Sequence, residues 1–180
     1  LTTTIAPVTT TSPPPTSPST TPPPTAPLPR ITEEGESNDE TVVIGLALSV
    51  NVADVEPDAF ANELMTTLND ERGWPRAGFS FVEDPSSSLQ VILAEPAEVD
   101  ELCRPLNTVS RFSCQVGPVV ALNADRWRSA TGSWDATIEE YRVYLVNHEV
   151  GHLIGQRHPQ QRCPVAGEPA RVMEQQTKGL

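Results

Sequence analysis

The three histidines of this chain all lie in one short stretch, NHEVGHLIGQRH, which covers residues 147–158. His148 and His152 are four residues apart, so on a helix both imidazoles would project from one face. Imidazole nitrogen is a preferred ligand of zinc, and a pair at this spacing can supply two of its positions. The stretch therefore predicts a metal site whose first two ligands lie on one helix.

The other residues of the stretch can complete this site. Gly155 is expected to end the helix, because glycine adopts a positive φ at no steric cost. The chain can then turn back, so that His158 becomes the third ligand of a zinc ion. Three protein ligands leave a position for water, as in catalytic rather than structural zinc sites. Glu149, beside the first ligand, is expected to act as the general base that takes a proton from this water.

Other interpretations of the stretch remain open. Two histidines four residues apart also occur on solvated helix faces without any metal. A structural zinc with Cys163 as its fourth ligand would account for the third cysteine, although it would leave the placement of Glu149 without a reason. Cys163 could instead be a free thiol or pair with a residue outside this chain.

The elements that must position these residues follow from the hydrophobic pattern. A helix of about twenty residues is expected from about Trp134, with Asp135 as its N-cap. A period-2 apolar pattern predicts a strand over residues 41–52, and a helix with Asp58 as N-cap is expected after Pro57. Further strands are expected at residues 79–82, 89–94 and 118–123. Together these elements predict an α+β domain.

The first forty residues differ sharply in composition from the rest. Residues 1–30 contain ten of the nineteen prolines, and residues 33–40 contain five carboxylates. Such segments have too little apolar surface to fold, so we expect a disordered stalk over residues 1–40 and one folded domain over residues 41–180. A Ser/Thr/Pro-rich stalk is typical of proteins displayed outside the cell, although a linker in a longer cytosolic protein has a similar composition.

The net charge and the hydropathy of the chain limit where the protein can be located and what it can bind. The net charge of −12 and the absence of a basic cluster argue against nucleic-acid binding. The apolar run at residues 42–48 is far too short to span a bilayer. An oxidised loop between Cys103 and Cys114 would stabilise a small exported domain by about 3 kcal/mol. We expect a monomer outside the cytoplasm, secreted or anchored to the cell surface through a removed N-terminal segment.

The pattern HExxHxxGxxH, from His148 to His158, resembles the signature of the metzincin zinc peptidases. This resemblance implies a twisted mixed β-sheet, an active-site helix that carries HExxH, and an irregular C-terminal region. It also implies that Met173 is the Met-turn methionine beneath the three imidazoles. Many metzincins place a tyrosine shortly after this methionine to stabilise the oxyanion. No tyrosine follows Met173 here. Gln175 or Gln176 is a candidate donor in its place, and a role of these glutamines in the fold is an equal alternative, which leaves the second catalytic partner open.

Four segments carry a closer likeness, namely LNDERGWPRAG, ELCRPLNT, YRVYLVNHEVGH and PARVMEQQTKGL. They resemble the actinobacterial family known as domain of unknown function 3152, whose members look like exported or membrane-anchored metzincin-type peptidases. The resemblance implies a disulfide between Cys103 and Cys114, and a partner for Cys163 beyond Leu180. It also assigns the motif residues: zinc ligands His148, His152 and His158, general base Glu149, turn residue Gly155 and Met-turn residue Met173.

The expected function is that of an extracytoplasmic zinc-dependent endopeptidase acting on protein or peptide substrates. The alternative is a zinc-stabilised, surface-displayed binding domain without turnover, which the long stalk and the missing tyrosine favour. Peptidoglycan peptides are a weaker candidate substrate, suggested by the expected location alone. A latent form, in which residues 33–40 or Cys163 cover the metal, is a further alternative.

Overall fold

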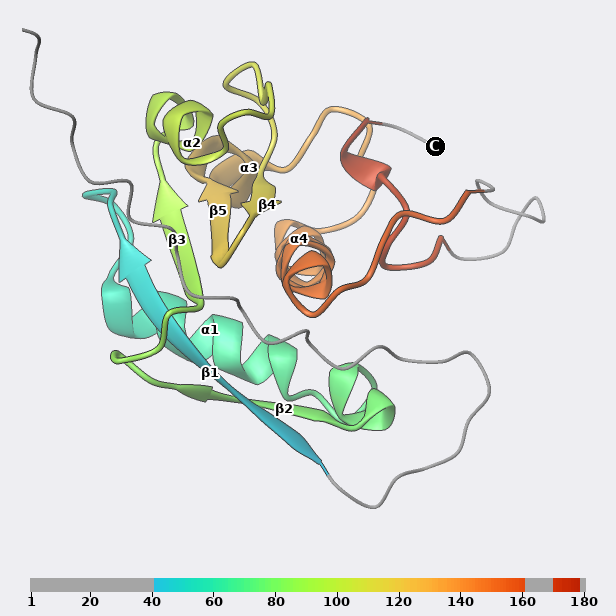
Figure 1. The fold of residues 1–180 in the computed structure, drawn as a ribbon. Helices are drawn as coiled ribbons and strands as arrows, with labels where there is room; N and C mark the ends of the chain where they lie inside the picture. Colours follow the sequence, from blue (N-terminus) through green and yellow to red (C-terminus); the bar gives the residue numbers. More distant parts are fainter. Residues whose placement is uncertain (1–40, 161–169, 179–180) are drawn as a thin grey trace, which may run out of the picture.

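A mixed five-stranded sheet organises the computed structural model, which describes residues 41–160 and 170–178 (Figure 1). The strands run in the order β2-β1-β3-β5-β4, and only β4 is antiparallel to its neighbour. Their bounds are β1 Val42–Val50, β2 Phe79–Glu83, β3 Gln90–Ala94, β4 Cys114–Val116 and β5 Val119–Asn123. The predicted α+β class with a mixed sheet is confirmed.

Four α-helices of the described residues cover the two faces of this sheet. Their bounds are α1 Pro57–Leu68, α2 Pro96–Leu102, α3 Ala124–Ser129 and α4 Ile138–Leu153. The period-2 geometry of the strands sends alternate side chains to opposite faces. On β3, Val91 and Leu93 join the large core with α1, α3 and α4, whereas Ile92 and Ala94 pack with α2 on the other face.

Helix α4, which carries His148, Glu149 and His152, is largely buried. It lies between the sheet and the C-terminal segment (Figure 1), and its buried residues include polar ones at its C-terminal end. The helix begins later than expected, because Thr137 rather than Asp135 is the N-cap. The Thr137 side chain accepts a hydrogen bond from the Glu140 N–H, and the Glu140 carboxylate accepts one from the Thr137 N–H. This reciprocal capping box satisfies the backbone N–H groups of Thr137 and Glu140.

Three further details of the helices differ from the sequence-based expectation. Helix α1 starts at Pro57 with Glu56 as N-cap, so Asp58 lies inside the first turn. Proline is well suited to the first helical position, because its φ is already helical and it has no N–H to leave unpaired. Helices α2 and α3 were not predicted. They have seven and six residues, too few to show a helical repeat in the sequence.

A disulfide joins Cys103 at the end of α2 to Cys114 at the start of β4, with 6.0 Å between their Cα atoms. It closes the loop of residues 104–113, and it is compatible with an extracellular location. Within the described ranges, no helix is long and apolar enough to cross a membrane. The expected stalk of residues 1–40 and the cysteine Cys163 lie outside the described residues.

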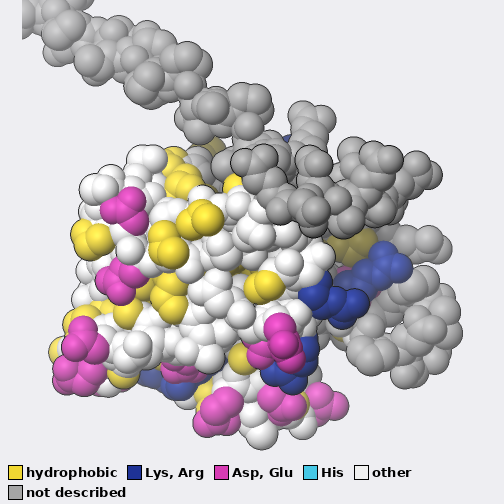
Figure 2. Space-filling view, turned by 90° about the horizontal axis from the view of Figure 1, so that it is seen from below, with side chains coloured by type: hydrophobic (Ala, Val, Ile, Leu, Met, Phe, Trp, Pro, Cys, Tyr) yellow, Lys and Arg dark blue, Asp and Glu magenta, His cyan; other side chains and the backbone are white. Residues whose placement is uncertain are grey.

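One face of the domain carries several separate acidic side chains (Figure 2). On this face the carboxylate side chains lie mainly towards the left and lower edges of the view, and hydrophobic side chains lie towards its centre. Basic side chains on this face are few, in keeping with 24 acidic and 12 basic residues in the chain. A concentration of cations at any one place is therefore unusual for this protein.

Candidate metal centre and its pocket

The helix α4 ends in a turn that reverses the chain just after the second histidine. The Gly155 N–H donates to the His152 carbonyl at 3.0 Å, and the Gln156 N–H donates to the Gly151 carbonyl at 2.8 Å. This pair of bonds is the Schellman motif, which needs a residue of positive φ after the helix. Gly155 supplies it with a φ of +92°. The predicted helix end is confirmed, and the returning chain brings His158 back to the helix.

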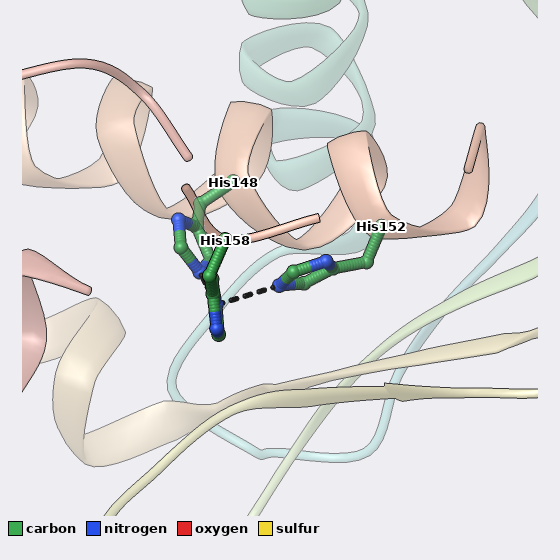
Figure 3. Close-up of side chains that lie close together, drawn as sticks. All are labelled: His148, His152 and His158. Carbon is green, nitrogen blue, oxygen red and sulfur yellow. Dashed lines mark hydrogen bonds between the residues drawn. The ribbon is translucent and has the colours of Figure 1, made fainter. Parts of the chain in front are cut away.

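The three imidazoles meet at one point, as Figure 3 shows. The Nε2 atom of His158 lies 3.1 Å from Nε2 of His148 and 3.0 Å from Nε2 of His152. Ligand nitrogens at about 2.0–2.1 Å from a tetrahedral zinc would lie about 3.3 Å from one another. The spacing of these atoms therefore fits a common metal ion.

Hydrogen bonds on the far side of two rings set the tautomers. The Nδ1 atom of His148 donates to the Val172 carbonyl at 2.7 Å, and Nδ1 of His152 donates to the Gln156 carbonyl at 2.9 Å. In a neutral imidazole the other nitrogen then carries a lone pair. Two Nε2 lone pairs thus face the same point, which a cation would satisfy.

Burial keeps these rings in the neutral form that binds metal. Removal from water lowers the pKa of His148 to about 4, and the neighbouring histidines add to this effect. Burial also lowers the pKa of His152 and of His158 below the ordinary value. The protein can therefore hold a metal ion with these three histidines at neutral pH, without first removing protons from them.

Glu149 lies next to the first histidine and is only 8% exposed. Burial raises the pKa of its carboxyl to about 8, because a charged carboxylate loses its hydration there. A cation bound nearby acts in the opposite direction and favours the carboxylate. Glu149 and the three histidines line one pocket, so the structure brings the predicted base and the predicted ligands together.

This pocket has a volume of about 400 Å³ and is lined by segments that are far apart in the sequence. Its walls are α4, the disulfide-closed loop, the edge strand β4, His158, and Gln175, Thr177 and Lys178 of the C-terminal segment. Asp100 holds the loop in place, because its carboxylate accepts hydrogen bonds from the Ser110 N–H at 2.7 Å and from the Thr108 hydroxyl. These bonds hold the pKa of Asp100 below its ordinary value.

Met173 packs directly against the helix that carries the histidines. Its side chain is 9% exposed and approaches Gly151 so closely that a Cβ there would lie 2.5 Å from its sulfur. The same Cβ would lie 3.0 Å from Cζ2 of Trp74. The adjacent Val172 carbonyl is the acceptor of His148, so the position of Met173 and the orientation of the first histidine are linked.

Two tyrosines of α4, which the sequence analysis did not single out, hold the C-terminal segment in place. The Tyr144 hydroxyl donates to the Glu174 carbonyl at 3.1 Å and accepts from the Gln176 N–H at 3.0 Å. The Tyr141 hydroxyl lies 3.2 Å from the Thr177 hydroxyl. Tyr144 also lines the pocket, and its position four residues before His148 on the helix is the signal that could have revealed it.

The two glutamines proposed as donors to an oxyanion behave differently. Gln175 lines the pocket. The Gln176 side-chain amide donates instead to the Arg171 carbonyl at 3.2 Å, so it helps to hold the turn around Met173. Gln175 is therefore the one of the pair that remains available to a ligand in the pocket.

A comparison with known protein families gives a match that covers the whole folded domain. The family model described as "Protein of unknown function (DUF3152)" matches residues 25–180 of the chain. The chain belongs to this family. No curated protein and no solved structure matches it. The pocket with the three histidines and Glu149 thus lies within the matched part of this DUF3152 protein.

Proposed function

We propose that this DUF3152 protein is an extracytoplasmic zinc-dependent endopeptidase of the metzincin type. The observation that carries the proposal is the convergence of three histidine Nε2 atoms in a pocket that also contains the buried carboxyl group of Glu149. Zinc held by these histidines supplies a Lewis acid that polarises the scissile carbonyl and lowers the pKa of water. The packing of Met173 beneath the helix supports the metzincin assignment.

Other residues of the chain would transfer the proton, orient the histidine rings and position the C-terminal segment. The Glu149 carboxylate accepts a proton from the attacking water and passes it to the leaving amine nitrogen. The backbone carbonyls of Val172 and Gln156 hold the rings of His148 and His152 in the tautomer that leaves Nε2 free. The Tyr144 hydroxyl has a role in positioning, because it donates to the Glu174 carbonyl and accepts from the Gln176 N–H of the C-terminal segment.

An extended peptide has a natural place beside β4. This strand is the last in the order of the described sheet, and its residues Cys114 and Gln115 line the pocket. A strand at a sheet edge has backbone groups free on its outer side, which can pair with a bound peptide. Leu106 and Phe112 provide apolar contacts on the loop above it.

The disulfide supports an extracytoplasmic location, because such bonds persist in oxidising compartments. It also closes the loop that forms one wall of the pocket, so oxidation and site geometry are connected. The competing proposal is a zinc-stabilised binding domain without turnover. It is favoured by the Tyr144 hydroxyl, whose bonds to the backbone leave it poorly placed to take over the role of the missing tyrosine.

The test is a comparison of zinc content and peptide hydrolysis in wild type and Glu149→Gln. We expect the variant to keep its zinc and to lose about 10²–10⁴-fold in hydrolysis rate, because only the proton transfer is removed. Glu139→Gln is the matched control, since Glu139 is an exposed carboxylate on the same helix and should be silent. Equal hydrolysis by Glu149→Gln and wild type would refute the mechanism. Zinc binding without any hydrolysis by wild type would favour the binding domain.

A further inference from the structure

A second cavity lies beside the candidate metal centre and has a volume of about 410 Å³. It shares three lining residues, Phe112, Thr177 and Lys178, with the pocket of the histidines. The two cavities are therefore neighbours, and a peptide bound in the first would have part of its length within reach of the second.

The second cavity is lined by three cations, Arg111, Arg126 and Lys178. Among the described residues, the ion pairs are made by other arginines, and none of these three takes part in one. This gathering contrasts with the net charge of −12 of the chain. We call the cavity that these three residues line the cationic pocket.

One N–H group of the Arg126 guanidinium lacks an acceptor among the described residues. The Nη1 atom of Arg126 donates to the Ala130 carbonyl, which fixes the guanidinium at the end of α3. Its Nε atom is buried and has no hydrogen-bond partner within the described part of the chain. The Nε and Nη2 atoms form the edge with which an arginine holds a carboxylate through two bonds, as Arg72 does with Asp70 at 2.8 and 2.6 Å.

The other lining groups suit the same ligand. The hydroxyls of Thr131 and Ser133 lie 3.1 Å apart and can donate to an anion. Lys178 holds its amine 5.1 Å from the ring centre of Phe112, at the part of the wall that both cavities share. A buried guanidinium N–H without an acceptor is unfavourable, so a carboxylate that reached it would gain a charge-assisted bond.

We propose that the cationic pocket binds a carboxylate of the peptide that occupies the neighbouring pocket, and so makes the protein selective for acidic or C-terminal segments. The carboxylate comes from an aspartate or glutamate side chain or from the free C-terminus of the substrate. The proposal rests on the proposed peptidase function for its consequence in catalysis, but the binding of a carboxylate can be measured without turnover.

The experiment uses three peptide series of equal length with the full chain. One carries a single glutamate at each position in turn with an amidated C-terminus, the second carries glutamine there instead, and the third has no acidic side chain but a free C-terminal carboxylate. We expect wild type to prefer one acidic series over the glutamine series by about tenfold or more in kcat/KM. The acidic series with the higher kcat/KM identifies the source of the carboxylate, which is either a side chain or the C-terminus. The preference should weaken as salt is added.

Arg126→Gln should reduce this preference to near onefold, and Lys178→Gln and Arg111→Gln should each reduce it in part. These two variants keep the test valid if Arg126→Gln fails to fold, since Arg126 also bonds the Ala130 carbonyl. Arg76→Gln is the matched control, because Arg76 is an exposed arginine that lines neither cavity. The inference would be overturned if the preference for an acidic series were unchanged in all three pocket variants. It would also be overturned if wild type showed no such preference.

The same peptides separate this inference from the proposed function. If wild type cleaves none of them, the peptidase proposal fails. The inference on carboxylate binding is then tested by calorimetry, which measures binding of the same peptides to the Glu149→Gln protein. Tighter binding of one acidic series, lost in Arg126→Gln but kept in Arg76→Gln, would uphold the cationic pocket. Equal binding of the acidic and glutamine series would reject it.

Discussion

At the scale of single residues, Gly151 determines how closely Met173 can approach the helix of the histidines. A methyl group there would lie 2.5 Å from the Met173 sulfur and 3.0 Å from Trp74. We predict that Gly151→Ala lowers the free energy of unfolding by about 1–3 kcal/mol, because the packed neighbours must move. Urea unfolding measures this, and Gly132→Ala is the control, since a Cβ at Gly132 meets nothing within 4 Å. An unchanged urea midpoint in Gly151→Ala would contradict the packing of Met173 described above.

The tyrosines give a second prediction at this scale, on pH dependence. The only tyrosines of the chain are Tyr141 and Tyr144, and burial raises the pKa of Tyr141 to about 12 and that of Tyr144 above its ordinary value. The unfolded value is about 10. A pKa raised on folding adds stability below about pH 10, and this stability is lost as the pH rises through the folded pKa.

Near-ultraviolet absorbance of tyrosinate tests this at about pH 10.5. The folded protein should show little tyrosinate, whereas the protein in urea should show most of its tyrosines ionised. Exposed tyrosines in the folded state would titrate near pH 10 in both samples, and that result would contradict the burial of both rings under the C-terminal segment.

At the scale of elements, the sequence predicts what depends on local repetition. The apolar alternation over residues 41–52 and the proline-free run before Gly155 identify β1 and α4 without further information. The caps were misplaced because an N-cap depends on which hydroxyl or carboxylate reaches the first turn, and Thr137 with Glu140 competes successfully with Asp135. Helices of six or seven residues, such as α2 and α3, owe their formation to packing and capping rather than to a repeat.

In the candidate site, too, the parts that depend on local sequence could be predicted and the parts that depend on the folded chain could not. The meeting of the three histidines follows from the spacing within one helix and one glycine turn, so it could be predicted. The cationic pocket could not be predicted, since only the folded chain brings its three cations together. Arg111 lies in the disulfide-closed loop, Arg126 in α3 and Lys178 in the C-terminal segment. Tyr144 lies between these cases, because its helix face was predictable but its two backbone partners were not.

The capping of α4 yields the prediction that belongs to this scale. Thr137→Ala removes the hydroxyl that accepts from the Glu140 N–H and should lower the free energy of unfolding by about 1 kcal/mol. Thermal unfolding measures it, with Thr66→Ala as control, since Thr66 is an exposed threonine inside α1 and alanine is the better helix former. If both variants unfolded alike, the capping box would contribute nothing to the stability of α4.

At the scale of the whole molecule, the candidate metal centre lies where separate parts of the chain meet. His148 and His152 belong to the central helix, whereas His158 lies on the irregular chain after it. The Val172 carbonyl ties this centre to the C-terminal segment through His148. A bound ion would therefore stabilise the returning chain and, through it, the wall of the pocket.

The last prediction follows from this connection. A ligand that binds only the folded state stabilises it by about 2.7 kcal/mol when present at a hundred times its Kd. We expect zinc to raise the melting temperature of wild type and a chelator to reverse the rise. His158→Ala should lose most of the zinc-dependent rise, because only two histidines remain, while the neighbouring Arg157→Ala should keep it. An equal rise in both variants would mean that zinc binds elsewhere, for example at exposed carboxylates of this acidic chain, and that the three histidines do not form the metal centre.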